Sequence, residues 1–239
     1  MAVNTTQWFD EQLAQARLLP VSFGQKTWLL DGRGVAYLPH KDLLVVSDLH
    51  LEKGSFLGSF GHPIPHFDSR ATLDRLAAII DDYQPSTLMC LGDSFHDANS
   101  LARMQSQDVD HLRHLISSVP RWQWILGNHD PHIPPQLAGE RWSRLCIDTI
   151  GFCHEPEVNW SAASYQVIGH FHPKVRHRAG RQSVTGRCFA LAEKIMILPA
   201  FGQYTGGLWV EHEVMQPLIP AAQRRCFILQ PPQIFALQQ

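Results

Sequence analysis

Three times in this chain a short apolar run ends in a polar motif, and this repetition constrains the fold more than any other feature of the sequence. The apolar runs cover residues 43–47, 87–91 and 122–126, and helical periodicity falls between them at 69–83 and 108–118. Continuous apolar runs of this length are typical of strands buried on both faces. Strands that alternate with helices favour an α/β fold, in which polar residues gather at the carboxyl ends of parallel strands.

The second half of the chain has a different pattern, with few helices and several short strand-like runs. These runs cover residues 145–152, 165–168, 187–191, 194–198 and 207–213. We interpret them as a second sheet packed on the first, because polar motifs continue into this region at His154, His170 and His172. We therefore expect one domain over residues 1–239, in which 1–26 form an N-terminal extension and 43–210 form the core that carries all the motifs.

The bulk properties exclude several classes of protein. The formal charge of the 239 residues is −2, so any contact with nucleic acid has to come from a local basic patch. No apolar run approaches the ~18 residues that a membrane span needs. The five cysteines are dispersed, which argues against a disulfide framework and for a reducing compartment. The N-terminus lacks the basic-then-apolar order of a signal peptide, and we expect a cytoplasmic protein without a membrane segment.

The polar motifs share one set of residue types: aspartate, asparagine and histidine. They read SDLH (47–50), GDSFHD (92–97), GNHD (127–130), HEP (154–156) and GHFH (169–172). Carboxylate, amide and imidazole donors without thiolate suit hard or borderline divalent cations. In Asp-x-His and His-x-His at a strand end, both donors fall on one face. Each fragment alone is weak, because a Gly-Asp dipeptide is usually a turn and a lone histidine is usually a surface or core residue.

Taken in order, the five motifs resemble the calcineurin-like metallophosphoesterase superfamily over nearly all of residues 43–210. The resemblance implies a four-layer α/β/β/α sandwich of two mixed sheets with a dinuclear metal site where the strands end. It implies that one metal is held by Asp48, His50 and His172, the other by Asn128, His154 and His170, and that Asp93 bridges both. It further implies that His129 is not a ligand but lies over the substrate phosphate, oriented by Asp130.

General chemistry supports these roles. Two cations about 3.5–4 Å apart can share a bridging hydroxide and clamp the attacking and leaving oxygens of an in-line displacement. The departing alkoxide needs a proton, which His129 as imidazolium can supply. We expect two divalent metal ions as cofactors. The resemblance favours Mn²⁺, and Fe, Zn or Co also suit these donors.

One position departs from the common second motif, Gly-Asp-x-x-Asp. His96 stands where the last aspartate is expected, and Asp97 follows it. We expect this change to affect substrate preference and not metal binding. The alternative is that His96 is a solvated loop residue without a role.

The segments 48–54, 92–97, 169–174, 198–201 and 206–207 together resemble the ligase-associated DNA damage response endonucleases of the PdeM type. This resemblance implies a phosphodiesterase in bacterial DNA repair, with a DNA ligase, an exonuclease and a helicase as partners. Candidate substrate contacts are Lys53, His96, Lys174 and Arg176. The last two begin a basic stretch over 174–187 that would hold flanking phosphates, or is simply a solvated charged loop.

Two other functions compete with a phosphodiesterase. A phosphomonoesterase acting on a nucleotide or small metabolite would use the same ligands, but would need a capped pocket, and no large cap insertion is visible. A non-catalytic scaffold should have lost His129 or several ligands, and this sequence retains them all.

Overall fold

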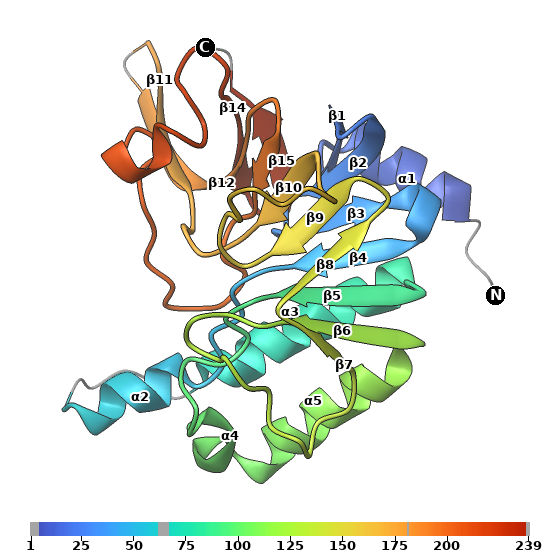
Figure 1. Ribbon diagram of the computed structural model, residues 1–239, viewed down its shortest axis with the longest axis vertical. Coiled ribbons are helices and arrows are strands. Elements are labelled where there is room, and N and C mark those ends of the chain that lie inside the picture. Colours follow the sequence, from blue (N-terminus) through green and yellow to red (C-terminus); the bar gives the residue numbers. More distant parts are fainter. Residues whose placement is uncertain (1–4, 62–66, 181, 238–239) are drawn as a thin grey trace.

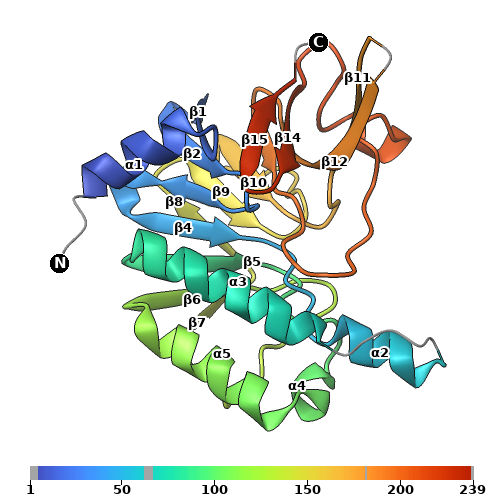
Figure 2. The same ribbon diagram turned by 180° about the vertical axis from the view of Figure 1, so that it is seen from behind.

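Two β-sheets pack face to face in this protein, whose computed structural model describes residues 5–61, 67–180 and 182–237 (Figure 1). Helices cover the outer face of the first sheet (Figure 2). Both sheets mix parallel and antiparallel strands, which confirms the expected α/β class with two mixed sheets. Among the described residues, no helix combines the length and apolar character needed to cross a membrane.

The first sheet contains the three strands expected from the apolar runs. Its strands, in spatial order, are β1 (Leu18–Phe23), β2 (Lys26–Asp31), β3 (Ala36–Leu38), β4 (Leu43–Val46), β5 (Thr87–Leu91), β6 (Arg121–Ile125) and β7 (Glu140–Trp142). The strands from β4 to β7 are parallel, with Val46 opposite Cys90 and Leu91 opposite Ile125. Their carboxyl ends, and the polar motifs that follow them, therefore lie along one edge of the sheet.

Three longer helices pack on the outer face of the first sheet: α1 (Thr5–Ala14), α3 (Asp68–Tyr83) and α5 (Ser106–Ser118). The helices expected at 69–83 and 108–118 are confirmed to within two residues. Two short helices, α2 (Lys53–Ser59) and α4 (Ser100–Arg103), lie near the edge where the motifs gather, and α2 extends away from the body of the molecule (Figures 1 and 2). A 3-10 turn, η1 (Pro39–Lys41), precedes β4.

The second sheet is built from the second half of the chain. In spatial order it contains β15 (Gln233–Ala236), β14 (Arg225–Gln230), β12 (Gln182–Leu191), β13 (Ile195–Ile197), β10 (Tyr165–Ile168), β9 (Ile150–Cys153) and β8 (Arg144–Ile147), and β11 (Lys174–Ala179) pairs with β12. The expected strand at 145–152 is a hairpin of β8 and β9. The prediction of a strand at 207–213 is wrong: this segment forms no strand, and Trp209 makes an isolated β-bridge with Lys174.

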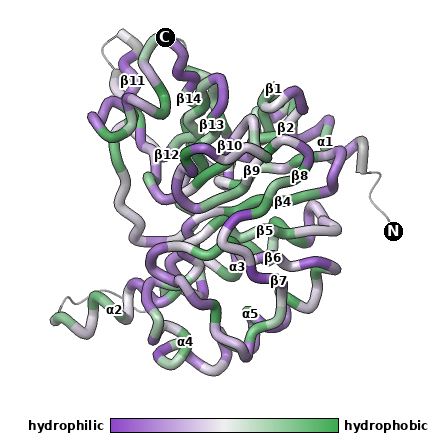
Figure 3. Tube along the Cα trace, viewed as in Figure 1, coloured by the Kyte–Doolittle hydropathy of each residue, from purple (hydrophilic) through white to green (hydrophobic). Residues whose placement is uncertain are grey.

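One hydrophobic core lies between the two sheets, where Trp28, Phe152 and Phe189 are fully buried, and another lies between the first sheet and its helices. Hydrophobic stretches run through β4 and other strands, whereas the loops are more hydrophilic (Figure 3). The outer face of the second sheet is covered by residues 208–219, which contain the 3-10 turn η2 (Glu213–Met215). This layer is irregular apart from η2, and Pro217 keeps a helix from continuing beyond that turn.

The expected N-terminal extension at residues 1–26 is part of the fold wherever it is described; residues 1–4 lie outside the described part. Leu18–Phe23 forms β1 and pairs along its whole length with β2. The sequence pattern did not indicate this strand because Pro20 interrupts it. Proline is tolerated on an edge strand, where its missing N–H faces no partner. Helix α1 packs on the first sheet and α3, where Trp8 contacts Tyr83 and Phe9 stacks on Tyr37. At the other end, β14 and β15 complete the second sheet beyond residue 210.

Candidate metal centre

The polar motifs adopt an unusual backbone at the strand ends. Asp48, His50, Asp93, His170 and His172 all have positive φ, between 44° and 66°. Left-handed conformations are uncommon for residues with a Cβ and persist where the surroundings enforce them, often at functional sites. Here backbone hydrogen bonds join the first two motifs, from His50 N to Asp93 O at 2.9 Å and from Asp48 N to Gly92 O at 3.2 Å.

The first donor set contains Asp48, His50 and His172. His172 Nε2 lies 3.0 Å from Asp48 Oδ1 and 3.3 Å from His50 Nε2. The Asp48 carboxylate is fully buried, and the Ser47 hydroxyl donates to its Oδ2 at 2.5 Å. Three ligand atoms therefore converge from two loops that are far apart in the sequence.

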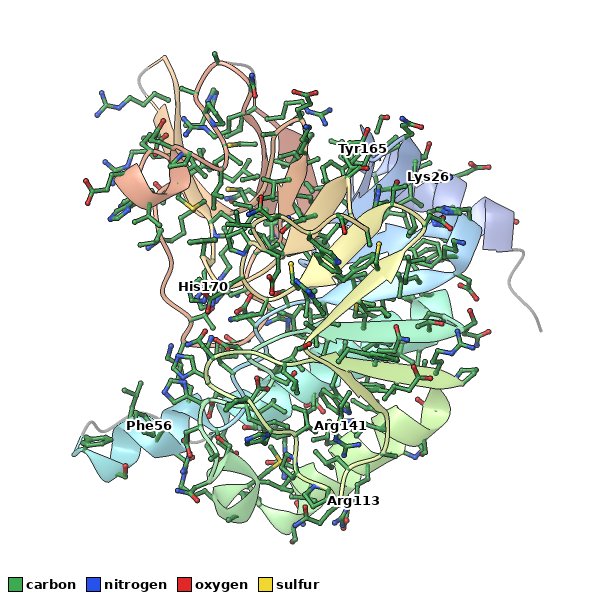
Figure 4. The ribbon with its side chains drawn as sticks, in the orientation of Figure 1. Lys26, Phe56, Arg113, Arg141, Tyr165 and His170 are labelled. Atoms are coloured by element: carbon green, nitrogen blue, oxygen red, sulfur yellow. The ribbon has the colours of Figure 1, made fainter. Side chains whose placement is uncertain are left out.

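The second donor set contains Asn128, His154 and His170. Asn128 Oδ1 is 3.0 Å from both His154 Nε2 and His170 Nδ1, and these two ring nitrogens are 3.3 Å apart. His154 follows β9 and His170 follows β10, two parallel strands of the second sheet, whereas Asn128 follows β6 of the first. His170 and Phe56 of α2 lie on the same side of the molecule (Figure 4). The centre is thus built where the carboxyl ends of both sheets meet.

Asp93 lies between the two sets. Its Oδ2 is 3.7 Å from His50 Nε2 of the first set and 3.2 Å from His154 Nε2 of the second. Its Oδ1 accepts a hydrogen bond from the backbone N–H of His129 at 2.9 Å. A carboxylate that faces two groups of ligands can neutralise a cation in each.

The charges in this cluster suit divalent cations. Burial alone would raise the pKa of Asp93, but the hydrogen bond and charge of His154 outweigh it and lower that pKa to about 2. Burial lowers the pKa of His50 to about 3, so its imidazole is neutral. Burial also acts to lower the pKa of His154, yet Asp93 and Asp48 raise it to about 9. Ionised carboxylates and neutral imidazoles are the forms that bind metal, and a cation would displace the proton of His154.

His129 is not oriented by Asp130, and that expectation is wrong. The buried Asp130 carboxylate accepts hydrogen bonds from the backbone N–H groups of Ser94 at 2.7 Å, Phe95 at 3.1 Å and Gly127 at 3.0 Å. His129 Nδ1 instead donates to the backbone carbonyl of His96 at 2.8 Å. Asp130 therefore ties together the loops that carry Asp93 and Asn128, a role that no local sequence pattern signals.

His96 belongs to the wall of the centre and is not a solvated loop residue. Its side chain is buried, and its ring stacks on that of His129 with centroids 5.0 Å apart and an interplanar angle of 22°. Its Nδ1 is 3.4 Å from His50 Nδ1. The edge of the Phe56 ring completes the packing at 4.6 Å between centroids. Burial and the charge of Lys53 lower the pKa of His96 to about 4. The neighbouring Asp97 pairs with Arg103.

The four expected substrate contacts divide into two places. Lys53 joins His96 beside the centre, where it is half-buried and interacts electrostatically with Asp93 and Asp48. Lys174 and Arg176 lie on β11, with their charges 5.0 and 5.1 Å from the centre of the Trp209 ring. Sequence reasoning assigned no role to Ser47 or to Trp209. Ser47 directly precedes the Asp-x-His motif and could have been noticed; Trp209 is too distant in sequence to have been linked to β11.

Residues 42–178 match the family model described as calcineurin-like phosphoesterase. Among solved structures, the chain is similar to the Pseudomonas putida nuclease MPE, with a TM-score of 0.73 and 24% sequence identity over 92% of this chain and 100% of that one. It also matches YfcE, a phosphoesterase from E. coli, with a TM-score of 0.36 and 17% identity over 79% of this chain and 88% of that one. No curated protein matches the chain in sequence.

The nuclease match supports the overall fold, and the family match covers the stretch that carries all five motifs. The matched stretch covers more than half of the chain. The protein therefore belongs to the calcineurin-like phosphoesterase family and is a hydrolase that acts on phosphoesters.

Proposed function

We propose that this protein is a two-metal phosphodiesterase that cleaves DNA, in the manner of a nuclease. The observation that carries the proposal is the position of Asp93, whose Oδ2 faces His50 at 3.7 Å and His154 at 3.2 Å. One carboxylate oxygen directed at two donor sets is what a pair of adjacent cations requires. A single metal would leave one of the two sets unused.

The donors are assigned as follows: Asp48, His50 and His172 hold one cation, Asn128, His154 and His170 hold the other, and Asp93 contacts both. When bound, two such cations acidify water and offset the negative charge of the phosphate. The protein keeps Asp48 and Asp93 ionised, since contacts with histidines lower the pKa of both carboxylates despite their burial. Ser47 holds the orientation of Asp48 through its hydroxyl.

His129 is the proposed acid for the leaving oxygen. Its ring lies 5.1 Å from that of His50, between centroids, and its side chain is exposed. The hydrogen bond from Nδ1 to the carbonyl of His96 fixes the plane of the ring. Nε2 then carries the proton that an imidazolium donates to a departing alkoxide. Lys53, beside Asp93 and Asp48, is placed to attract the negatively charged ester.

Two observations favour a diester over a monoester. Within the described ranges 5–61, 67–180 and 182–237, no inserted domain covers the strand ends where the polar motifs gather. The similar fold of the Pseudomonas putida protein belongs to a nuclease. We further propose Mn²⁺ as the metal, action in bacterial DNA repair with a ligase, an exonuclease and a helicase, and a cytoplasmic location, in keeping with five free cysteines.

The test compares bis-p-nitrophenyl phosphate with p-nitrophenyl phosphate, using purified protein loaded with Mn, Fe, Zn or Co. We expect faster hydrolysis of the diester, fastest with Mn²⁺, and loss of activity in Asp93→Asn. Cleavage of circular DNA would show endonucleolytic action. Faster monoester hydrolysis would reject this proposal in favour of a phosphomonoesterase. Full activity in Asp93→Asn would reject the proposed site.

A further inference from the structure

A second, basic cavity of about 610 Å³ lies apart from the metal centre, between α3, β12 and the turn that joins β14 to β15. Figure 2 shows α3 and this turn on the same face of the molecule. Arg33, Arg75 and Arg187 are the charged residues of its lining, and none of the described residues that line it is acidic. Gln203 adds a polar amide, and Leu229 and Pro231 form an apolar wall.

The positive charge of this cavity is largely uncompensated. Arg33 is paired with Asp31 at 2.8 Å and with Asp82 at 2.5 Å. Arg75 and Arg187 have no carboxylate partner in the described part of the chain; each donates to a backbone carbonyl, Phe201 O at 3.0 Å and Ala200 O at 2.9 Å. Burial, and then the charge of Arg187, lower the pKa of Arg75 to about 10, so its guanidinium group remains charged at neutral pH. Burial also lowers the pKa of Arg187. Two half-buried like charges without a counter-ion are costly, and an anion in the cavity would offset that cost.

We infer that this cavity binds a phosphate-bearing anion of mononucleotide size. Guanidinium groups bind phosphate through paired N–H donors, and arginine is favoured for this task. The volume falls within the range of about 300–1,000 Å³ that small-molecule sites occupy. The apolar wall suits a sugar or base attached to the phosphate. The stretch 174–187 was expected to hold phosphates as one basic loop, but Arg187 turns into this cavity, away from the Trp209 cluster of Lys174 and Arg176.

The cavity is connected to the metal centre through two consecutive peptide groups. Ala200 O accepts from Arg187, and the N–H of the same peptide group, on Phe201, donates to Ser47 O at 2.9 Å. Phe201 O accepts from Arg75, and the N–H of Gly202 donates to Asp48 O at 3.0 Å. Each peptide group thus lies between an arginine of the cavity and the backbone of the first metal motif. These hydrogen bonds give an anion bound to the arginines a direct route to the backbone of Asp48.

The first experiment is a calorimetric titration of the full-length, Mn²⁺-loaded protein with inorganic phosphate. We expect one phosphate at the metals and one in the cavity. Gln203→Glu places a carboxylate in the cavity at almost unchanged volume and should weaken the second site at least tenfold. Gln107→Glu, an exposed change of the same charge on α5, is the matched control and should bind as the unmodified protein does. Asp93→Asn should lose the metal-dependent site and retain the cavity site.

The inference is overturned if Gln203→Glu binds phosphate as the unmodified protein does, or if Asp93→Asn abolishes all phosphate binding. Because Arg75→Gln keeps a donor for Phe201 O, it gives a second variant that should also lose the cavity site. The site does not depend on catalysis. A protein with the cavity site but without diesterase activity would refute the proposed function and leave this inference standing.

Two sources of the phosphate can be separated by kinetics. If the ligand is part of the DNA strand, Gln203→Glu raises the KM for an oligonucleotide far more than the KM for bis-p-nitrophenyl phosphate. If the ligand is a free nucleotide, deoxyadenosine monophosphate changes the rate of diester hydrolysis by the unmodified protein and by Gln107→Glu, but much less that of Gln203→Glu. Either result supports the cavity site and identifies its occupant.

Discussion

Gly92 gives the sharpest test of how the metal centre is assembled, because a single methyl group there would strike a proposed ligand. Gly92 has a φ of +77°, and an added Cβ would overlap Nδ1 and Cγ of His154 and come within 2.6 Å of its Cβ. His154 is 4% exposed and cannot move aside freely. The left-handed backbone costs about 1–2 kcal/mol for alanine, and overpacking costs about 1–3 kcal/mol.

Together these terms predict that Gly92→Ala destabilises the protein by about 2–5 kcal/mol. At about 2–4 °C per kcal/mol for a chain of this size, the Tm falls by about 4–20 °C. The displaced His154 should also cost the protein one cation. We would measure Tm by calorimetry and metal content by mass spectrometry, and expect one metal ion per chain in place of two.

Gly61→Ala is the matched control. Gly61 also has a positive φ, +81°, but an added Cβ would meet no atom of the described residues within 4 Å. Gly61→Ala should lower the free energy of unfolding only by the cost of the left-handed backbone, about 1–2 kcal/mol, and should keep both metals. A different result would refute this reasoning: Gly92→Ala retains two metal ions and has the same Tm as Gly61→Ala. The packing of His154 against Gly92 would then not position a ligand.

Three further predictions concern His129, pH and metal removal. His129→Ala should lower kcat about 10²–10⁴-fold for diesters with alkoxide leaving groups. The loss should be much smaller for diesters that release p-nitrophenolate, which needs no proton. An equal loss for both kinds of diester, or the same loss in the control His132→Ala, also at an exposed histidine, would contradict the acid role. The pKa of His154 is raised to about 9, so in the metal-free protein its contribution to stability is full below pH 6.5 and disappears as the pH rises through 9. Urea midpoints of chelator-treated protein should show this decline, and His154→Gln should not. Mn²⁺ at about 100 times its Kd should add about 2.7 kcal/mol per site to the unfolding free energy, and a Tm that chelators leave unchanged would show that no metal binds the folded state.

Much of the first sheet could be predicted from sequence because its signals are local. The runs that became β4, β5 and β6 are apolar at almost every position, as buried parallel strands require, and α3 and α5 show helical periodicity. The edge strand β1 was missed because Pro20 interrupts its pattern. The packing of residues 208–219 on the outside of the second sheet was not predicted, because it depends on contacts with strands that are distant in the sequence.

The candidate site divides in the same way. Its donor types and their order along the chain were evident from the motifs, because each motif directly follows a strand. The contacts among them were not. The approach of His172 to Asp48 joins residues more than a hundred positions apart, and depends on how the two sheets pack.

The role of Asp130 shows the limit of local reasoning most clearly. Its position next to His129 suggested a side-chain pair, but its partners are the backbone amides of Ser94, Phe95 and Gly127. Arg187, which local sequence placed in a basic loop, turns into a cavity beside Arg75. Sequence by itself determined which residues follow each strand, because hydrophobic periodicity depends on near neighbours. Only the tertiary structure decided which side chains meet, because those partners come from distant segments that the packing of two sheets brings together.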